Sequence, residues 1–136
     1  MAGSQNPVVT PRNPWLLVAA ASGLVAVAAS GYGWHGLAAD AGAREVYTTG
    51  VQYQMWHSLA LLAVAWLADR HPAGTPAGRW ARLAGLCFAI GIVLFSGSMY
   101  FFGLFGEVPF PGAAPVGGFA LMAGWASLAV AATRKG

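Results

Sequence analysis

Residues 83–105 read LAGLCFAIGIVLFSGSMYFFGLF, an apolar run that contains no charged side chain. A helix that crosses the hydrocarbon core of a bilayer needs about 20 mostly apolar residues, and this run is long enough. Three further runs qualify, over residues 15–37, 47–68 and 116–132. The alternation of apolar and polar residues that marks a membrane β-barrel does not recur. The sequence therefore predicts an all-α protein, an integral membrane four-helix bundle that forms one membrane domain over residues 1–136.

The composition leads to the same class of protein. Hydrophobic residues make up 57% of the chain and charged residues 8%, whereas a soluble domain carries roughly 25% charged residues. The net charge is +3, but the basic residues form no stripe of the kind that binds nucleic acid, so we expect no nucleic-acid partner. Cys87 is the single cysteine, which excludes a disulfide within the chain.

Proline and glycine separate the apolar runs, since proline cannot continue a helix and glycine loosens one. They gather in residues 71–78 and 109–115, which are predicted to be loops. The first run could also be a cleaved signal peptide, because Arg12 precedes it and residues 28–30 resemble a cleavage site. Its apolar stretch is long for a signal core, so we expect it to be retained as a span.

Basic residues concentrate in the cytoplasmic loops of membrane proteins, and here they alternate with the predicted spans. One set of segments, at the two ends and between the second and third spans, holds every basic residue except Arg44: these are Arg12, Arg70, Arg79, Arg82, Arg134 and Lys135. An even number of spans with both termini in the cytoplasm fits this pattern. We expect a multi-pass protein of the bacterial inner (plasma) membrane.

Small residues recur at helical spacing in three of the predicted spans. Lipid supplies no hydrophobic drive between helices, so close contact between small residues matters for their association. We expect these stripes to be packing faces: Ser22, Ala26, Ala29 and Gly33 in the first span, Gly85, Ala89, Ile92, Ser96 and Gly103 in the third, and Gly117, Gly118 and Gly124 in the fourth.

Polar residues inside the second and third spans form the candidate site. His57 lies about ten residues from the outer end of its span, or ~15 Å deep, and Ser96 lies ~14 Å deep from the same side. Because a polar group near the midplane must find partners inside the bundle, we predict a cluster of His57, Gln54, Ser96 and Tyr100. The cluster has two interpretations: hydrogen bonds that fasten the second and third helices together, or part of a ligand or proton path.

The sequence provides little evidence for a haem site, a copper site or a catalytic carboxylate. His35 and His57 could be axial ligands of one haem, but their depths differ by ~12 Å. A copper site of His57, Met55 and Met99 is conceivable by ligand type, without a supporting spacing. The acidic residues lie in loops or at span ends, as Asp40, Glu45, Asp69 and Glu107. We therefore expect no enzyme and no metal site, and the sequence identifies no cofactor.

Four segments carry a resemblance to a known family. They are GWHGL at residues 33–37, TGVQYQMWHSLALL at 49–62, LFSGSMY at 94–100 and PVGGFALMAGW at 115–125. In this order the chain resembles the transmembrane protein 256-like family called domain of unknown function 423. The resemblance implies a four-helix integral membrane protein and no established activity.

Three hypotheses for the function remain open. The first is a non-enzymatic accessory or assembly subunit of a membrane complex, because the predicted bundle is rich in small-residue faces and poor in reactive groups. The alternative is a binder of a small apolar ligand, a quinone, lipid or haem, near His57. A further alternative is an oligomeric channel or transporter. The expected partners are the lipid bilayer and either a membrane protein or further copies of the chain.

Overall fold

The computed structural model describes residues 13–37 and 41–135, and nearly all of them are helical. The helices are α1 (Pro14–Gly36), α2 (Ala41–Arg70), α3 (Pro76–Gly91), α4 (Gly97–Phe105) and α5 (Ala113–Thr133). A π-helical segment, η1 (Ile92–Ser96), joins α3 to α4. Because α3, η1 and α4 continue one another over Pro76–Phe105, the described residues form four helical columns, and the fold is all-α.

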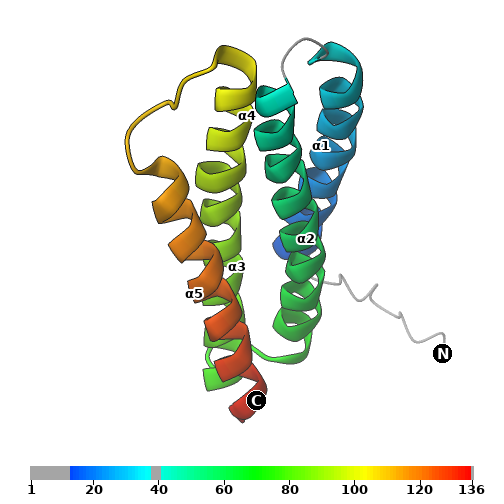
Figure 1. The fold of residues 1–136 in the computed structure, drawn as a ribbon. Helices are drawn as coiled ribbons and strands as arrows, with labels where there is room; N and C mark the ends of the chain where they lie inside the picture. The colour runs from blue at the N-terminus through cyan, green and yellow to red at the C-terminus, as the bar shows by residue number, and fades with distance from the viewer. Residues whose placement is uncertain (1–12, 38–40, 136) are drawn as a thin grey trace, which may run out of the picture.

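The columns stand side by side, and successive columns run in opposite directions (Figure 1). Helix α2 packs against α1 on one side and against α3, η1 and α4 on the other, while α5 packs mainly against α3 and η1. The start of α1 lies near the far end of α2, since the Asn13 side chain donates to the carbonyl of Ala65 at 2.9 Å. Helix α2 is thus one of the two central columns.

Three of the described helices begin at least three residues before the predicted apolar runs. Helix α5 begins at Ala113, so the predicted loop over residues 109–115 is wrong for its last three residues. Helix α3 begins at Pro76 rather than near Leu83, so the predicted loop over residues 71–78 is wrong for its last three residues. Proline suits the first turn of a helix because its φ is preset, and the Thr75 hydroxyl accepts from the backbone N–H of Gly78 at 3.1 Å. Helix α2 likewise begins at Ala41, six residues before the predicted apolar run. A helix can extend through polar residues that a search for apolar runs does not include.

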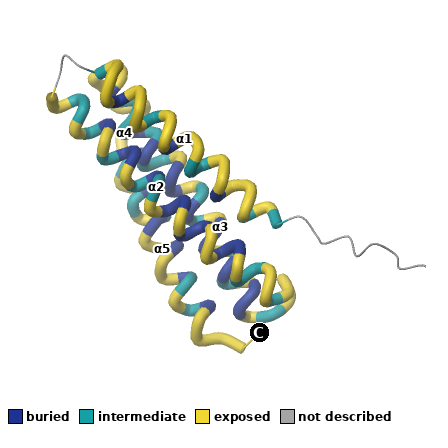
Figure 2. Tube along the Cα trace, turned by 90° about the vertical axis from the view of Figure 1, so that its right-hand side faces the viewer, coloured by how far each residue is buried: buried dark blue, intermediate teal, exposed yellow. Residues whose placement is uncertain are grey.

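The core lies between the central columns and α5. It contains the fully buried Leu61, Val64 and Phe88. Glycines let the helices approach: a Cβ on Gly124 would lie 2.6 Å from the Phe88 ring, and one on Gly117 would meet the backbone of Phe95. The stripe predicted for the fourth span is therefore a packing face. Figure 2 traces this buried seam along the inner sides of the helices, with α1 mostly exposed.

The outer surface of the bundle is apolar. Leu17, Leu24 and Val93 are each at least 70% exposed, which suits contact with lipid rather than water. Among the described residues, three helices are long and apolar enough to cross a membrane: Pro14–Gly36, Pro76–Phe105 and Ala113–Thr133. Helix α2 is not among them, and it is the helix that carries Gln52, Gln54 and His57.

Candidate functional site

Gln54 is the centre of a hydrogen-bonded group that links three helices. Its Oε1 accepts from the hydroxyl of Tyr100 on α4 at 2.5 Å; the sequence placed both residues in one cluster without predicting this particular pair. Its Nε2 donates to the backbone carbonyl of Ser22 on α1 at 2.9 Å. Gln54 is only 5% exposed, so its amide group is shielded from lipid and ties α2 to both of its neighbours.

Ser22 and Ser58 complete this group, and sequence reasoning missed their role. The Ser58 hydroxyl donates to Ser22 Oγ at 2.7 Å and lies 2.7 Å from the carbonyl oxygen of Gln54. Ser22 was predicted only as a small residue in a packing stripe. The missed signal is a hydroxyl placed midway along an otherwise apolar helix, where it needs a partner. We call Ser22, Gln54, Ser58 and Tyr100 the Gln54 network.

His57 lies outside this network and joins α2 to α5. Its Nδ1 lies 2.6 Å from the carbonyl oxygen of Tyr53, and the indole N–H of Trp125 donates to its Nε2 at 3.1 Å. A carbonyl only accepts and an indole N–H only donates, so these two bonds fit a neutral ring protonated on Nδ1. The Phe88 ring packs against the imidazole, with centroids 5.5 Å apart.

The predicted meeting of His57 with Ser96 does not occur among the described residues. Ser96 ends the π-helical segment and is 1% exposed, yet its Oγ has no hydrogen-bond partner. The prediction rested on depth, and depth alone does not fix which way a side chain turns on its helix. The predicted cluster is therefore divided: Gln54 and Tyr100 are bonded, His57 pairs with Trp125, and Ser96 is unpaired.

The hydrogen bonds of His57 argue against the copper and haem sites considered from the sequence. Both ring nitrogens of His57 already have protein partners, so a metal ion or haem iron at Nε2 would have to displace the indole of Trp125. His35 lies at the far end of α1, in a hollow that it shares with Arg44. The described residues contain no group of three or more His, Cys, Asp or Glu side chains able to hold a metal ion.

Apolar helices with an apolar surface and internal hydrogen bonds define a multi-pass integral membrane protein. The model of the family described as "Protein of unknown function (DUF423)" matches residues 29–118. The chain belongs to this family, which confirms the resemblance carried by its motifs.

The chain is similar to curated bacterial membrane proteins along most of its length. It is 38% identical to "UPF0382 membrane protein" of Haemophilus influenzae over 120 residues, which cover 87% of this chain and 92% of that protein. It is 37% identical to "UPF0382 inner membrane protein YgdD" of Escherichia coli K12, with 88% of each chain covered. A 37% identity to "UPF0382 membrane protein YwdK" of Bacillus subtilis covers 88% of this chain and 96% of that protein.

No solved structure matches the chain. The relatives and the apolar helices together place the protein in the bacterial inner membrane, as the sequence predicted. The family has no assigned activity, so the function has to be argued from the geometry of this chain.

Proposed function

We propose that this protein is a non-enzymatic accessory or assembly subunit of a membrane complex. The observation that carries the proposal is that the polar side chains Gln54 and His57 inside the bundle are hydrogen-bonded to other parts of the protein. The amide of Gln54 and both ring nitrogens of His57 are engaged by protein partners. Side chains held in this way stabilise one arrangement of the helices, which is what a scaffold needs, and neither Gln54 nor His57 is left free to act on a substrate.

The proposal includes four membrane spans. Helix α2 has 30 residues, which at 1.5 Å per residue is about 45 Å, longer than the ~30 Å hydrocarbon core. It connects the end of α1 to the start of α3, and it packs along both columns. If α1 and the α3–α4 column cross the bilayer side by side, α2 crosses it too. Its polar side chains Gln54, His57 and Ser58 are buried in the protein, which makes the crossing tolerable.

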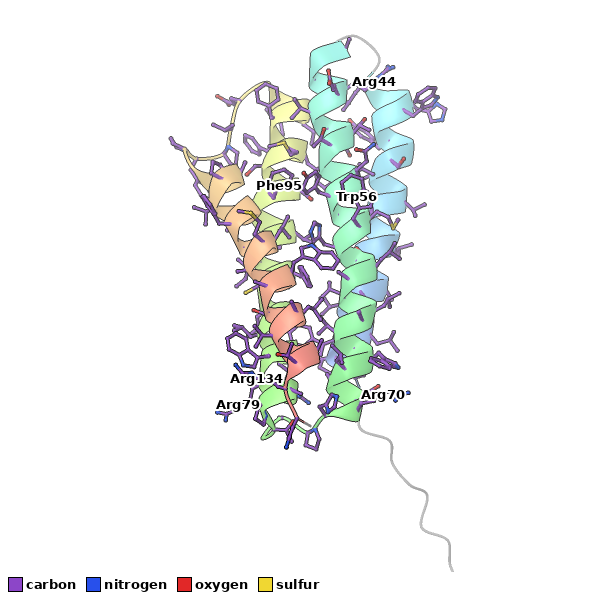
Figure 3. The ribbon with its side chains drawn as sticks, turned by 60° about the horizontal axis from the view of Figure 1, so that its bottom comes forward. Arg44, Trp56, Arg70, Arg79, Phe95 and Arg134 are labelled. Atoms are coloured by element: carbon purple, nitrogen blue, oxygen red, sulfur yellow. The ribbon has the colours of Figure 1, made fainter. Side chains whose placement is uncertain are left out.

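The proposal also places both termini in the cytoplasm. Arg70, Arg79 and Arg134 lie at one end of the bundle and Arg44 at the other (Figure 3). The end with more basic residues is expected to face the cytoplasm. A reporter enzyme that is active only outside the cytoplasm should be inactive when fused after Lys135 and active when inserted between α4 and α5. The opposite pattern would reverse the proposed orientation.

The surface that would receive a partner is the outer face of α1. Its residues recur every three or four positions and are all exposed, namely Leu17, Ala21, Leu24 and Ala28. Helix α1 packs mainly against α2, and this face is exposed among the described residues. Alternating leucine and alanine gives a shallow surface onto which a second helix can pack closely, because small residues allow backbones to approach.

Purification in a mild detergent tests the proposal. A tagged chain should bring down a membrane protein in fixed stoichiometry, and Ala28→Leu should reduce the recovery at least fivefold. Ala126→Leu on α5 is the matched control, since Ala126 is also exposed, and it should leave the recovery unchanged. A chain that is a lone monomer in several mild detergents, or equal loss from both variants, would contradict the proposal.

One observation favours a second candidate, the binder of a small apolar ligand that the sequence predicted near His57, with Ser96 as the residue that would contact the ligand. The Ser96 hydroxyl is buried without a partner, and a polar atom of a ligand such as a quinone would satisfy it. The absorption spectrum and solvent extraction of the purified protein test this function. A bound molecule that is lost in Ser96→Ala would support it, and a preparation with neither a haem band nor an extracted quinone would exclude both ligands.

A further inference from the structure

A hollow opens between α1 and α2 near the end of the bundle that holds Arg44. It has a volume of about 380 Å³, and its lining includes Trp34, His35, Arg44 and Thr48. A second hollow of about 330 Å³ follows it along the same two helices and is lined by Val27, Gln52, Met55 and Trp56, among others. Ser30 and Val51 line both hollows, so the two form one groove, which we call the α1–α2 groove.

The polarity of this groove changes in a fixed order along α2. Arg44, Thr48 and Gln52 are spaced four residues apart on one side of the helix, so each step covers about 6 Å along the axis. The next step reaches Trp56, beside Met55, where the groove is apolar. The groove thus offers a cation, then neutral polar groups, then an apolar channel. These complement, in the same order, the phosphate, the glycerol esters and the acyl chain of a phospholipid.

Two polar side chains of the groove have no hydrogen-bond partner in the part of the chain that the structure describes. Gln52 and Thr48 are exposed, and neither side chain has a hydrogen bond to the residues that the structure describes. Gln52 lies eleven residues into α2, about 16 Å from its start, where lipid tails supply no donor or acceptor. An amide at this depth needs a polar partner from outside the chain, and an ester carbonyl is an acceptor for its N–H groups.

Arg44 is placed to meet an anion. Its Nε donates to the carbonyl of Leu37 at 3.0 Å, and its guanidinium lies over the Trp34 ring at 5.8 Å. These contacts hold the stem. No hydrogen bond within the described residues engages the terminal amino groups, for which phosphate is a well-suited acceptor. Glu45 lines a neighbouring hollow together with Arg44, Thr48 and Gln52, but no ion pair joins the Glu45 and Arg44 side chains that the structure describes. Arg44 is also the one Lys or Arg of the sequence that lies outside the predicted cytoplasmic segments. A role in binding an anion would explain its position.

We propose that the α1–α2 groove binds one phospholipid with an anionic headgroup. Arg44 receives the phosphate, Thr48 and Gln52 donate to the glycerol ester groups, and an acyl chain lies against Val27, Met55 and Trp56. The volume of each hollow falls in the range of small-ligand sites, roughly 300–1,000 Å³. The site rests on the proposed crossing of α2, and it is separate from the partner face on α1.

Native mass spectrometry of the delipidated protein with added phosphatidylglycerol or phosphatidylcholine tests this site. The protein should retain one phosphatidylglycerol, and Arg44→Gln should weaken retention about tenfold. Gln52→Leu should weaken it two- to tenfold, and it removes no bond within the described fold. Arg79→Gln, at the other end of the bundle, should leave retention unchanged.

Several outcomes would overturn the proposal. Equal retention of both lipids, or equal loss in Arg44→Gln and Arg79→Gln, would mean that no specific lipid site exists. Displacement of the lipid by inorganic phosphate alone would reduce the site to an anion site. Cross-links from a photoreactive residue at position 52 to a protein instead of a lipid would assign the groove to a protein partner. None of these readouts depends on the partner recovery that tests the proposed function.

Discussion

The two faces of α2 use the same kinds of polar side chain in opposite ways. On the inward face, Gln54, His57 and Ser58 are buried and bonded to α1, α4 and α5. On the face along the groove, Thr48 and Gln52 are exposed without a partner among the described residues. Gln52 and Gln54 stand two positions apart, so residue type and depth are nearly matched. Inward polar groups therefore belong to the fold, and outward ones are available for something outside the chain.

A close helix contact at Gly50, on the inward face of α2, gives the largest expected effect. A Cβ on Gly50 would lie 2.8 Å from Met99 Cβ and 3.2 Å from the carbonyl oxygen of Ser96, so α2 and α4 would have to separate. Gly50→Ala should lower the free energy of unfolding by about 1–3 kcal/mol, measured by SDS titration in bicelles. Gly97→Ala is the matched control, because no atom lies within 4 Å of its Cβ position, and a helix gains up to about 1 kcal/mol from this change. Similar losses in both would show that the contact is not tight.

The link between α2 and α5 is expected to have a smaller effect. His57→Phe and Trp125→Phe each remove the bond between Trp125 Nε1 and His57 Nε2, and each should lower the free energy of unfolding by roughly 0.6 kcal/mol, up to about 1.7. Because both variants remove one interaction, the double variant should cost less than the sum of the two. Strict additivity across this double-mutant cycle would mean that the two side chains do not interact.

Ser96 gives the smallest expected effect on the inward face. Its hydroxyl has no partner, so Ser96→Ala removes a polar group that is costly to bury. The free energy of unfolding of the purified protein should stay the same or rise by up to about 1 kcal/mol. A loss of 1 kcal/mol or more would mean that the hydroxyl is satisfied by a bound molecule, as the second candidate function requires.

The sequence was sufficient for the class of fold because apolar length is a strong signal. It identified the helices and the packing role of Gly117 and Gly124. It also placed Gln54 and Tyr100 in one polar cluster, because few polar partners exist at that depth, but it centred that cluster on His57 and Ser96.

The sequence was insufficient where side-chain direction decides the contact. Depth estimates placed His57 beside Ser96, but His57 turns toward α5 and bonds to Trp125. The π-helical segment over Ile92–Ser96 carries no clear sequence signal, and it changes which side of the column each later residue faces. Residue spacing along an ideal helix cannot anticipate that change.

The central claim is that the inward polar face of α2 holds the fold together and the groove face does not. The most direct test compares Gln54→Leu with Gln52→Leu by free energy of unfolding in lipid bicelles free of phosphatidylglycerol. We predict a loss of about 1–2 kcal/mol for Gln54→Leu, which leaves Tyr100 and Ser22 without their partner, and a change within about 0.5 kcal/mol for Gln52→Leu. Equal losses, or a larger loss for Gln52→Leu, would contradict the account.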